Sequence, residues 1–455
     1  MSRYDKTEAL QELSAEAIQS EVERILASEK FARSKRLRSL LRFTVAQTLQ
    51  GNADILKEYV IGTEVLKKPD SYDPRSDSLV RVLASRLRVK LKEYYSDGGS
   101  DDPLVIEFPK GKYVPRFQRR EQLQTEIEKK LRARNACSQG KFLITRLSEQ
   151  RLAEAAERFE DAIEADPSWP AAHEGLANVY AFQAVLGFRR AREAWPAARA
   201  QAEATLALDD MSADAHVVLG MVCALYEWRW RDAESHFQKA IDRDACSGAA
   251  HLWRALALLL PLGKTAQANE EIARGRELAP TLLLDEGQAL AFYLSGRHEE
   301  ALRRLDEGSG TALPAWSARL RARVLNQLGR AGEAVALLEQ MRQREPAAAI
   351  LADLACSYAA AGNMEKARET MGELRERRAP GSWISNCDMA AVETALDNRN
   401  EAMMLLHEAL REREPALAYV AADPRFEALR DTPKYASVLR RMMLVNGEEI
   451  RAQGA

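Results

Sequence analysis

A pattern of small and large apolar residues recurs about every 34 to 35 residues between Gln139 and Pro415, and it limits the possible folds more than any other feature. Each copy has a first segment with a Leu-Ala or Leu-Gly pair and a second segment in which alanines flank a large apolar residue. The clearest second segments contain Ala155, Phe159, Ala162 and Pro167, and then Ala233, Phe237 and Ala240. A unit of this length cannot bury its own apolar face, so the pattern predicts a solenoid of stacked helix pairs.

The residue types suit close packing between helices. Alanine or glycine lets two helices touch, a large apolar side chain fills the remaining gap, and proline ends the second helix. We count about eight copies, one of which is lengthened by about nine residues around Val185 to Trp195, and another by one residue near Trp228. The segment from Ala422 to Met443 is predicted to cap the last copy.

This pattern resembles the tetratricopeptide repeat. The resemblance implies an α-solenoid over residues 137–447, capped at its C-terminal end. It also implies a concave groove that binds a protein or peptide partner and, in some members, a small ligand. The fold class expected for the whole chain is therefore mainly α.

The stretch from Asp77 to Phe117 predicts one long helix followed by a β-hairpin. A core-facing stripe has helical spacing, and it contains Val80, Leu83, Ala84, Leu87, Leu91 and Tyr94. The opposite stripe is polar and contains Arg81, Ser85, Arg88 and Lys92. Residues 104–108 and 112–117 are predicted strands, and Pro109 to Gly111 form a turn between them.

Three further helices are expected before this stretch. They begin at Ser14, at Ser34 and at Ile55, and the last one is expected to end near Leu66. A charged, helix-prone linker over residues 119–136 follows the hairpin. The sequence therefore predicts a small α plus β-hairpin domain over residues 1–118.

Helix and hairpin together resemble the winged helix-turn-helix output domain of OmpR/PhoB-type regulators. The residues that carry this resemblance are Val80, Val82, Ser85 to Arg88, Lys90, Leu91, Gly111, Tyr113 and Phe117. Similar segments precede tetratricopeptide repeats in bacterial transcription regulators, and the match covers Phe31 to Phe117. It implies binding of double-stranded DNA through the long helix and the wing. The DNA-binding residues expected are Arg81, Ser85, Arg86, Arg88, Lys92, Lys110 and Lys112.

Charge is distributed unevenly along the chain. The formal net charge is -2, yet residues 30–116 carry 18 basic and 11 acidic side chains. Positive charge therefore accumulates where the DNA-binding element is expected, which suits neutralisation of phosphates.

The sequence offers little for catalysis, metal or cofactor. His173, His216 and His251 occupy the same place in three successive copies, but packing residues at these places are a better interpretation than a metal site, because no carboxylate or thiol accompanies all three at ligand spacing. We expect no catalytic residue, no cofactor and no metal. Five cysteines without a CxxC pair and the lack of a long apolar run indicate a cytoplasmic protein outside the membrane.

Two functions remain open from the sequence. The first is a DNA-binding transcriptional regulator whose repeats sense or dock a partner. The alternative is a repeat-based adaptor whose N-terminal domain mediates assembly and does not bind DNA. The operator, the direction of regulation, the partner and the oligomeric state do not follow from the sequence.

Overall fold

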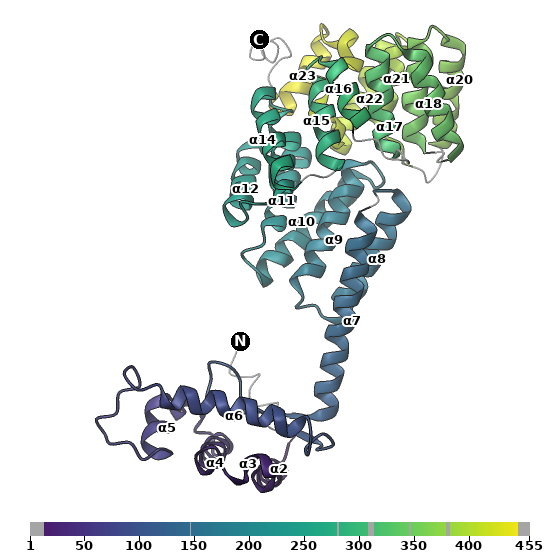
Figure 1. Cartoon of the computed structure of the whole chain (residues 1–455). Coiled ribbons are helices and arrows are strands. Elements are labelled where there is room, and N and C mark those ends of the chain that lie inside the picture. Colours follow the sequence, from purple (N-terminus) through teal and green to yellow (C-terminus); the bar gives the residue numbers. More distant parts are fainter. Residues whose placement is uncertain are drawn as a thin grey trace. The chain divides into compact units, whose positions relative to one another are not determined.

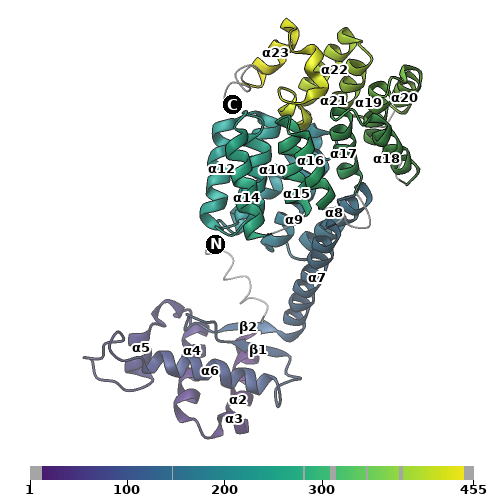
Figure 2. The same cartoon turned by 45° about the horizontal axis from the view of Figure 1, so that its top comes forward.

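The chain forms two compact units, Met1–Leu131 and Arg132–Ala455. The computed structural model describes residues 13–145, 147–279, 282–307, 314–344, 347–378 and 383–444, without the side chains of 282–284. The boundary between the units falls inside one helix, α7 (Arg120–Ile144). Figure 1 and Figure 2 show the two units, which are mainly helical.

The first unit contains five helices, a 3-10 turn and a hairpin in its described part. They are α2 (Ala15–Ala27), α3 (Glu29–Ala32), α4 (Lys35–Leu49), η1 (Ala53–Ile55), α5 (Glu58–Glu64), α6 (Leu79–Tyr95), β1 (Leu104–Glu107) and β2 (Arg116–Arg119). The helix expected from Ser14 begins there, because the Ser14 side chain accepts a hydrogen bond from the Ala17 N–H. The helix expected over residues 55–66 is shorter, because Leu56 and Lys57 are not helical and α5 begins only at Glu58.

Helix α6 buries the apolar stripe that its sequence predicted. All six stripe residues are buried: Val80, Leu83, Ala84, Leu87, Leu91 and Tyr94. They join one core with residues of α2, α4 and β1, among them Ile25, Leu40 and Ile106, each at most 1% exposed. Burial of this stripe therefore fixes which side of α6 faces solvent.

The hairpin exists, but its second strand begins later than the sequence predicted. The antiparallel register pairs Glu107 with Arg116 and Leu104 with Arg119, so residues 108–115 connect the strands. The expected turn at Pro109 to Gly111 lies within this loop, where the Lys112 N–H donates to the Pro109 carbonyl at 3.3 Å. Proline has no N–H to donate to a ladder, and Pro109 and Pro115 lie at the two ends of this loop. The expected strand at 112–117 was wrong for this reason in its first half.

The second unit is a solenoid of helix pairs. In its described part, eight successive pairs follow one another, and Figure 1 shows them stacked in chain order. After α7, the helices are α8 (Glu149–Ala165), α9 (Pro170–Val185), α10 (Ala191–Leu208), α11 (Ala213–Met221), α12 (Trp230–Arg243), α13 (Gly248–Trp253), α14 (Thr265–Leu278), α15 (Leu282–Leu294), α16 (His298–Glu307), α17 (Ala315–Gln327), α18 (Ala331–Arg344), α19 (Ala348–Ala360), α20 (Met364–Arg377), α21 (Asn386–Ala395) and α22 (Arg399–Glu412). Two 3-10 turns, η4 (Pro415–Tyr419) and η5 (Pro424–Leu429), and helix α23 (Pro433–Arg441) form the cap.

Glycines and alanines allow the close helix contacts that the repeat pattern predicted. Phe159 of α8 is fully buried between α7 and α9. A Cβ added at Gly140 would lie 2.8 Å from the Phe159 ring, and one added at Gly175 would lie 2.1 Å from it. Such distances leave no room for a side chain, so each glycine is required by the phenylalanine that it touches.

Two first helices widen into π-helical turns. The turn η2 (Val222–Glu227) follows α11, and η3 (Arg254–Leu259) follows α13. In η3 the Leu260 N–H donates to the Ala255 carbonyl at 2.9 Å, five residues back. After η2, Trp228 adopts a left-handed conformation with φ of 58°. The single extra residue seen in this copy is thus accommodated by a π turn, a feature that often accompanies functional sites.

The early and late parts of the solenoid touch each other. Trp230 Nε1 donates a hydrogen bond to the Met442 carbonyl at 2.9 Å, and the Tyr419 hydroxyl donates to the Leu256 carbonyl at 3.1 Å. The Arg413 guanidinium lies 4.8 Å from the centre of the Trp228 ring and donates to the Tyr226 carbonyl. The cap therefore packs against the third and fourth helix pairs, and the superhelix encloses an interior.

Candidate binding sites in the two units

Arg88 holds the hairpin loop. Its Nε lies 2.8 Å from the Phe108 carbonyl oxygen, and its Nη2 lies 2.9 Å and 3.1 Å from those of Pro109 and Lys112. These bonds give the loop carbonyls charged donors that the strand ladder does not supply. The structure therefore places Arg88 between helix and loop, where it positions the backbone. Its expected contact with a DNA base remains a prediction.

The polar stripe expected on α6 forms, because Arg81, Ser85, Arg88 and Lys92 recur at three- and four-residue spacing along one continuous helix. Arg81 donates to the Pro74 carbonyl at 3.2 Å and lies 3.8 Å from the Glu58 carboxylate. Lys92 is exposed farther along the helix. Lys110 and Lys112 are exposed in the loop that Arg88 holds.

Ser85 and Arg86 face a groove that the sequence did not reveal. This groove has a volume of about 750 Å³ and lies between the start of α4 and the exposed side of α6. Its basic side chains are Arg33, Lys35, Arg36, Arg86 and Lys90, and its floor includes the exposed Val82 and Val89. The sequence signal for this groove is the run from Arg33 to Arg36, which contains three basic residues in four positions.

The three aligned histidines each have a partner of their own. His173 Nδ1 lies 2.7 Å from the Gln201 side-chain oxygen, and His251 Nδ1 lies 2.6 Å from a Glu271 carboxylate oxygen. His216 Nδ1 lies 3.1 Å from His236 Nδ1, so one ring donates and the other accepts. Among the described residues, no three His, Cys, Asp or Glu side chains gather closely enough to hold a metal ion.

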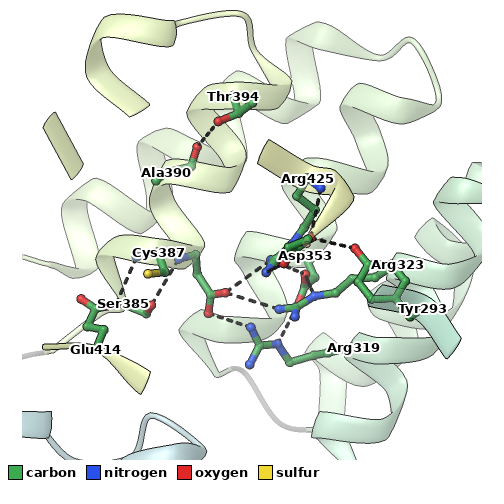
Figure 3. A network of polar contacts seen from close by, with 12 residues as sticks. Tyr293, Arg319, Arg323, Asp353, Ser385, Cys387, Ala390, Thr394, Glu414 and Arg425 are labelled. Carbon is green, nitrogen blue, oxygen red and sulfur yellow. Dashed lines mark hydrogen bonds and ion pairs between the residues drawn. The ribbon is translucent and has the colours of Figure 1, made fainter. Parts of the chain in front are cut away.

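A buried ionic network joins five successive layers of the solenoid. Figure 3 shows Arg319 and Arg323 of α17 pointing toward Asp353 of α19, with Arg425 of η5 approaching the same group. The Nε atoms of Arg319 and Arg323 each lie 2.6 Å from an Asp353 oxygen. The network has three further members. Asp388 of α21 lies 2.6 Å from Arg319, and Asp423 lies 2.7 Å from Arg425. The Tyr293 hydroxyl of α15 donates a hydrogen bond to Asp423 at 3.0 Å.

The arginines keep the buried carboxylates charged. Burial by itself raises the pKa of Asp353, but Arg323, Arg319 and Arg425 outweigh it and hold this pKa well below its usual range. Arg425 has the same effect on the pKa of Asp423. Burial raises the pKa of the neighbouring Cys356 thiol to about 12, so this thiol stays protonated at neutral pH. These groups form a paired scaffold with no reactive member.

A cavity of about 230 Å³ lies in the interior of the solenoid, next to this network. Its walls are aromatic and apolar, and they include Phe182, Trp253, Trp316, Trp383 and Tyr419. Trp253 ends α13 directly before the π turn η3, and Leu256 of η3 also lines the cavity. The insertion after α9 contributes Leu186 and Gly187 to the wall. The irregular parts of the repeat pattern thus meet at one place.

The charged groups at the cavity have different partners. Arg319, Arg323 and Arg425 face Asp388 within the network. Glu414 caps the start of α21, because it accepts hydrogen bonds from the backbone N–H groups of Asn386 and Cys387 at 2.8 Å and 3.1 Å. Glu286 of α15 is 3% exposed, and neither of its carboxylate oxygens has a hydrogen-bond partner among the described residues.

The sequence contains a signal for the network, namely acidic residues at the spacing of the repeat, which the sequence-based prediction did not use. Asp353, Asp388 and Asp423 are spaced at 35 residues, the period of the repeat itself. Equivalent positions in successive units of a solenoid lie one above another. Three acidic residues in a core-facing register, together with Arg319 one period earlier, would have predicted a charged ladder.

Comparison with solved structures finds helical-repeat proteins of low sequence identity and low TM-score. Chains of similar structure include a thermophilic tetratricopeptide repeat protein of Thermus thermophilus, with 21% identity over 43% of this chain and 98% of that chain, and a TM-score of 0.35. A tetratricopeptide repeat protein of Parabacteroides merdae has 15% identity over 62% of this chain and 99% of its own, with a TM-score of 0.39. YrrB, described as a tetratricopeptide repeat protein with an unusual peptide-binding site, has 18% identity over 50% of this chain and 94% of its own, with a TM-score of 0.22. No family model and no curated protein matches the sequence.

These comparisons give no support to the OmpR/PhoB-like domain or to DNA binding. The sheet in the described part of the first unit has two strands. The assignment of a mainly helical solenoid rests on the successive helix pairs of the second unit. In the residues that the structure describes, no helix is long and apolar enough to span a bilayer.

Proposed function

We propose that this chain is a helical-repeat interaction protein that binds a segment of a partner protein in the interior of its solenoid and acts in the cytoplasm without catalysis. The observation that carries the proposal is the interior cavity, whose aromatic walls come from helices far apart in the sequence. Aromatic pockets with a few charged groups are the usual place for a ligand's anchoring side chains. This function corresponds to the adaptor alternative.

A blocked cavity tests this function. Ala416 lies in η4, is exposed, and lines the cavity, so Ala416→Trp fills the site with little cost to the core. Peptides selected from a random display library on the full chain are expected to bind Ala416→Trp at least about tenfold more weakly, a loss of about 1.4 kcal/mol. Fluorescence anisotropy with labelled peptides measures the affinities.

The matched control is Ala360→Trp. Ala360 is exposed at the end of α19 and is not part of the cavity wall. This variant adds the same bulk elsewhere on the solenoid and is expected to keep the original affinity. Selected peptides that bind all three proteins equally, or a selection that returns no binder, would exclude the interior as the binding site.

DNA binding is the second candidate function, favoured by the basic groove between α4 and α6. Arg36 and Arg86 are both exposed at this groove. Phosphate contacts of such side chains make affinity fall steeply with salt. We infer that, if the first unit binds double-stranded DNA, this groove and the exposed loop lysines make the contacts.

A salt series separates this candidate from the adaptor. For the regulator, the full chain binds duplexes recovered from genomic fragments, and Arg86→Ala reduces the slope of log K against log salt by about one. The control is Arg274→Ala, since Arg274 is an exposed arginine of α14 in the other unit. The adaptor interpretation requires that no duplex is retained at any salt concentration, and one salt-dependent duplex would refute it.

A further inference from the structure

One acidic group at the cavity, Glu286, has no hydrogen-bond partner among the described residues. The Ser317 side chain is the nearby group that favours its charged form. Asp388 is bonded to Arg319, and Glu414 accepts several N–H donors. Glu286 differs, because both of its carboxylate oxygens lack a partner among the described residues and less than a tenth of the residue is exposed. A buried acid without a donor costs free energy, which makes it a place for a missing partner.

The surroundings of Glu286 indicate the chemistry of that partner. Trp253, Trp316 and Trp383 line the same cavity, together with Phe182. The faces of such rings attract cations, and tryptophan does so most strongly. Leu256 and Leu290 add apolar surface that an alkyl stem would cover.

We propose that this cavity receives an ammonium group on an apolar stem, which pairs with Glu286 and lies against the tryptophan rings. The group is either a lysine side chain of the partner segment or a free alkylamine. This proposal deepens the proposed function, since it rests on the interior being the binding site. Arg319 and Arg323, which also line the cavity, are paired with Asp353 and Asp388 and therefore do not pair with Glu286.

Binding of a cation by Glu286 expels a proton. Burial raises the pKa of Glu286 to about 8, with Asp285 contributing and Ser317 opposing, so the free carboxyl is mostly protonated at pH 7. An ammonium favours the charged form, and about one proton per bound amine is therefore released. Of the charged groups on the surrounding elements, Asp285 is paired with Arg276 and Arg304. The others line the cavity itself, and they are Arg319, Arg323, Asp388, Glu414 and Arg425.

The test is calorimetry on the full chain with matched small probes. n-Pentylamine is charged at pH 7, and 1-pentanol has a similar stem without the charge. The amine is expected to bind at least about tenfold more tightly than the alcohol, with proton release that appears as a dependence of heat on buffer ionisation. The release is expected to vanish at pH 9, where Glu286 is already charged.

Glu286→Gln keeps the shape of the side chain and removes the charge. This variant is expected to lose both the preference for the amine and the proton release. Nα-acetyl-lysine amide distinguishes the sources: stronger binding than n-pentylamine assigns the site to a lysine side chain, and weaker binding assigns it to a free amine. Its Nε-acetylated form is the neutral control.

Two outcomes would overturn the inference. Wild-type protein that binds 1-pentanol as tightly as n-pentylamine has no ammonium site, and this measurement needs no variant. A Glu286→Gln protein that retains the preference places the cation elsewhere. If selected peptides remain sensitive to Ala416→Trp while the amine has no preference, the proposed function stands and only the ammonium site fails.

Discussion

The two units differ in where their arginines lie, at the surface or in the interior. In the first unit, Arg36 and Arg86 lie exposed along a groove. In the solenoid, Arg319, Arg323 and Arg425 lie among buried aspartates. An exposed charge is available to a partner at little cost to the fold, whereas a buried one is part of the folding free energy. The comparison separates charge that is available for binding from charge that contributes to the folded architecture.

The position of one arginine in the first unit complicates this contrast. Arg88 lies on the DNA-facing side that the sequence suggested, yet its N–H groups bond to loop carbonyls. It therefore resembles the solenoid arginines more than Arg86. Four experiments test the contrast, beginning with the largest expected effect.

Asp353→Asn removes the carboxylate that three arginines share. The solenoid then retains buried positive charge without its counter-ion, and we expect the free energy of unfolding to fall by about 3 to 5 kcal/mol. Urea denaturation followed by circular dichroism measures the change. The control is Glu333→Gln in the exposed pair with Arg330, where a much smaller loss is expected because solvent screens the pair. Equal losses in the two variants would remove the distinction between the buried and exposed pairs.

The pH dependence of stability tests the buried histidine pair. Burial, together with His236 and Arg243, lowers the pKa of His216 to about 4, from 6.5. The unfolded chain therefore binds more protons between these values, so His216 contributes a loss of stability as the pH is lowered from 7 to 4. His216→Gln is expected to flatten this part of the curve in urea denaturation at a series of pH values. An unchanged slope would contradict the assignment to His216.

Ala240→Leu overpacks the solenoid core. Ala240 is fully buried on α12, which also carries Phe237. The helices are so close here that a Cβ added at Gly220 of α11 would lie 2.8 Å from the Phe237 ring. Extra methylenes in such a contact cost about 1 to 3 kcal/mol, so the melting temperature should fall. Ala360→Leu at the exposed end of α19 is the matched control. A wild-type melt for both variants would mean that α12 does not make the close contact described.

Arg88→Ala is expected to have the smallest effect on stability, about 1 to 2 kcal/mol, because the side chain is only half-buried. Its loss leaves the loop carbonyls without their donors, so amide hydrogen exchange of residues 108–115 should accelerate. If DNA binds, a positioning role predicts weaker binding to every duplex, whereas base contact predicts a loss of about 1 to 3 kcal/mol on the cognate site alone. Arg86→Ala, which leaves the loop intact, is the control for exchange.

Much of the helical framework followed from local pattern. The stripe from Val80 to Tyr94 is buried as expected, and the Phe159 and Ala240 positions lie at helix contacts. The hairpin was less predictable. Its strands depend on which carbonyls Arg88 captures and on where Pro109 and Pro115 interrupt the ladder, and neither is a property of one short segment.

The candidate sites show the same division. The basic run from Arg33 to Arg36 was visible in the sequence, but its partner, the side of α6 with Arg86, depended on the packing of α4 against α6. Glu286 looked like any other carboxylate in a helix. Its burial and its missing partner result from neighbours more than thirty residues away, such as Trp253 and Trp383.

The sequence by itself determined the helix pairs, because a repeat near 35 residues with alanine, glycine and phenylalanine at fixed places can bury its apolar faces only by stacking. Only the tertiary structure decided how far the solenoid curves. That curvature brings the cap onto Trp228 and Trp230 and encloses the cavity beside Glu286. The reason is physical: periodicity fixes contacts between neighbours, whereas the closure of a superhelix is the sum of many small rotations that no single repeat specifies.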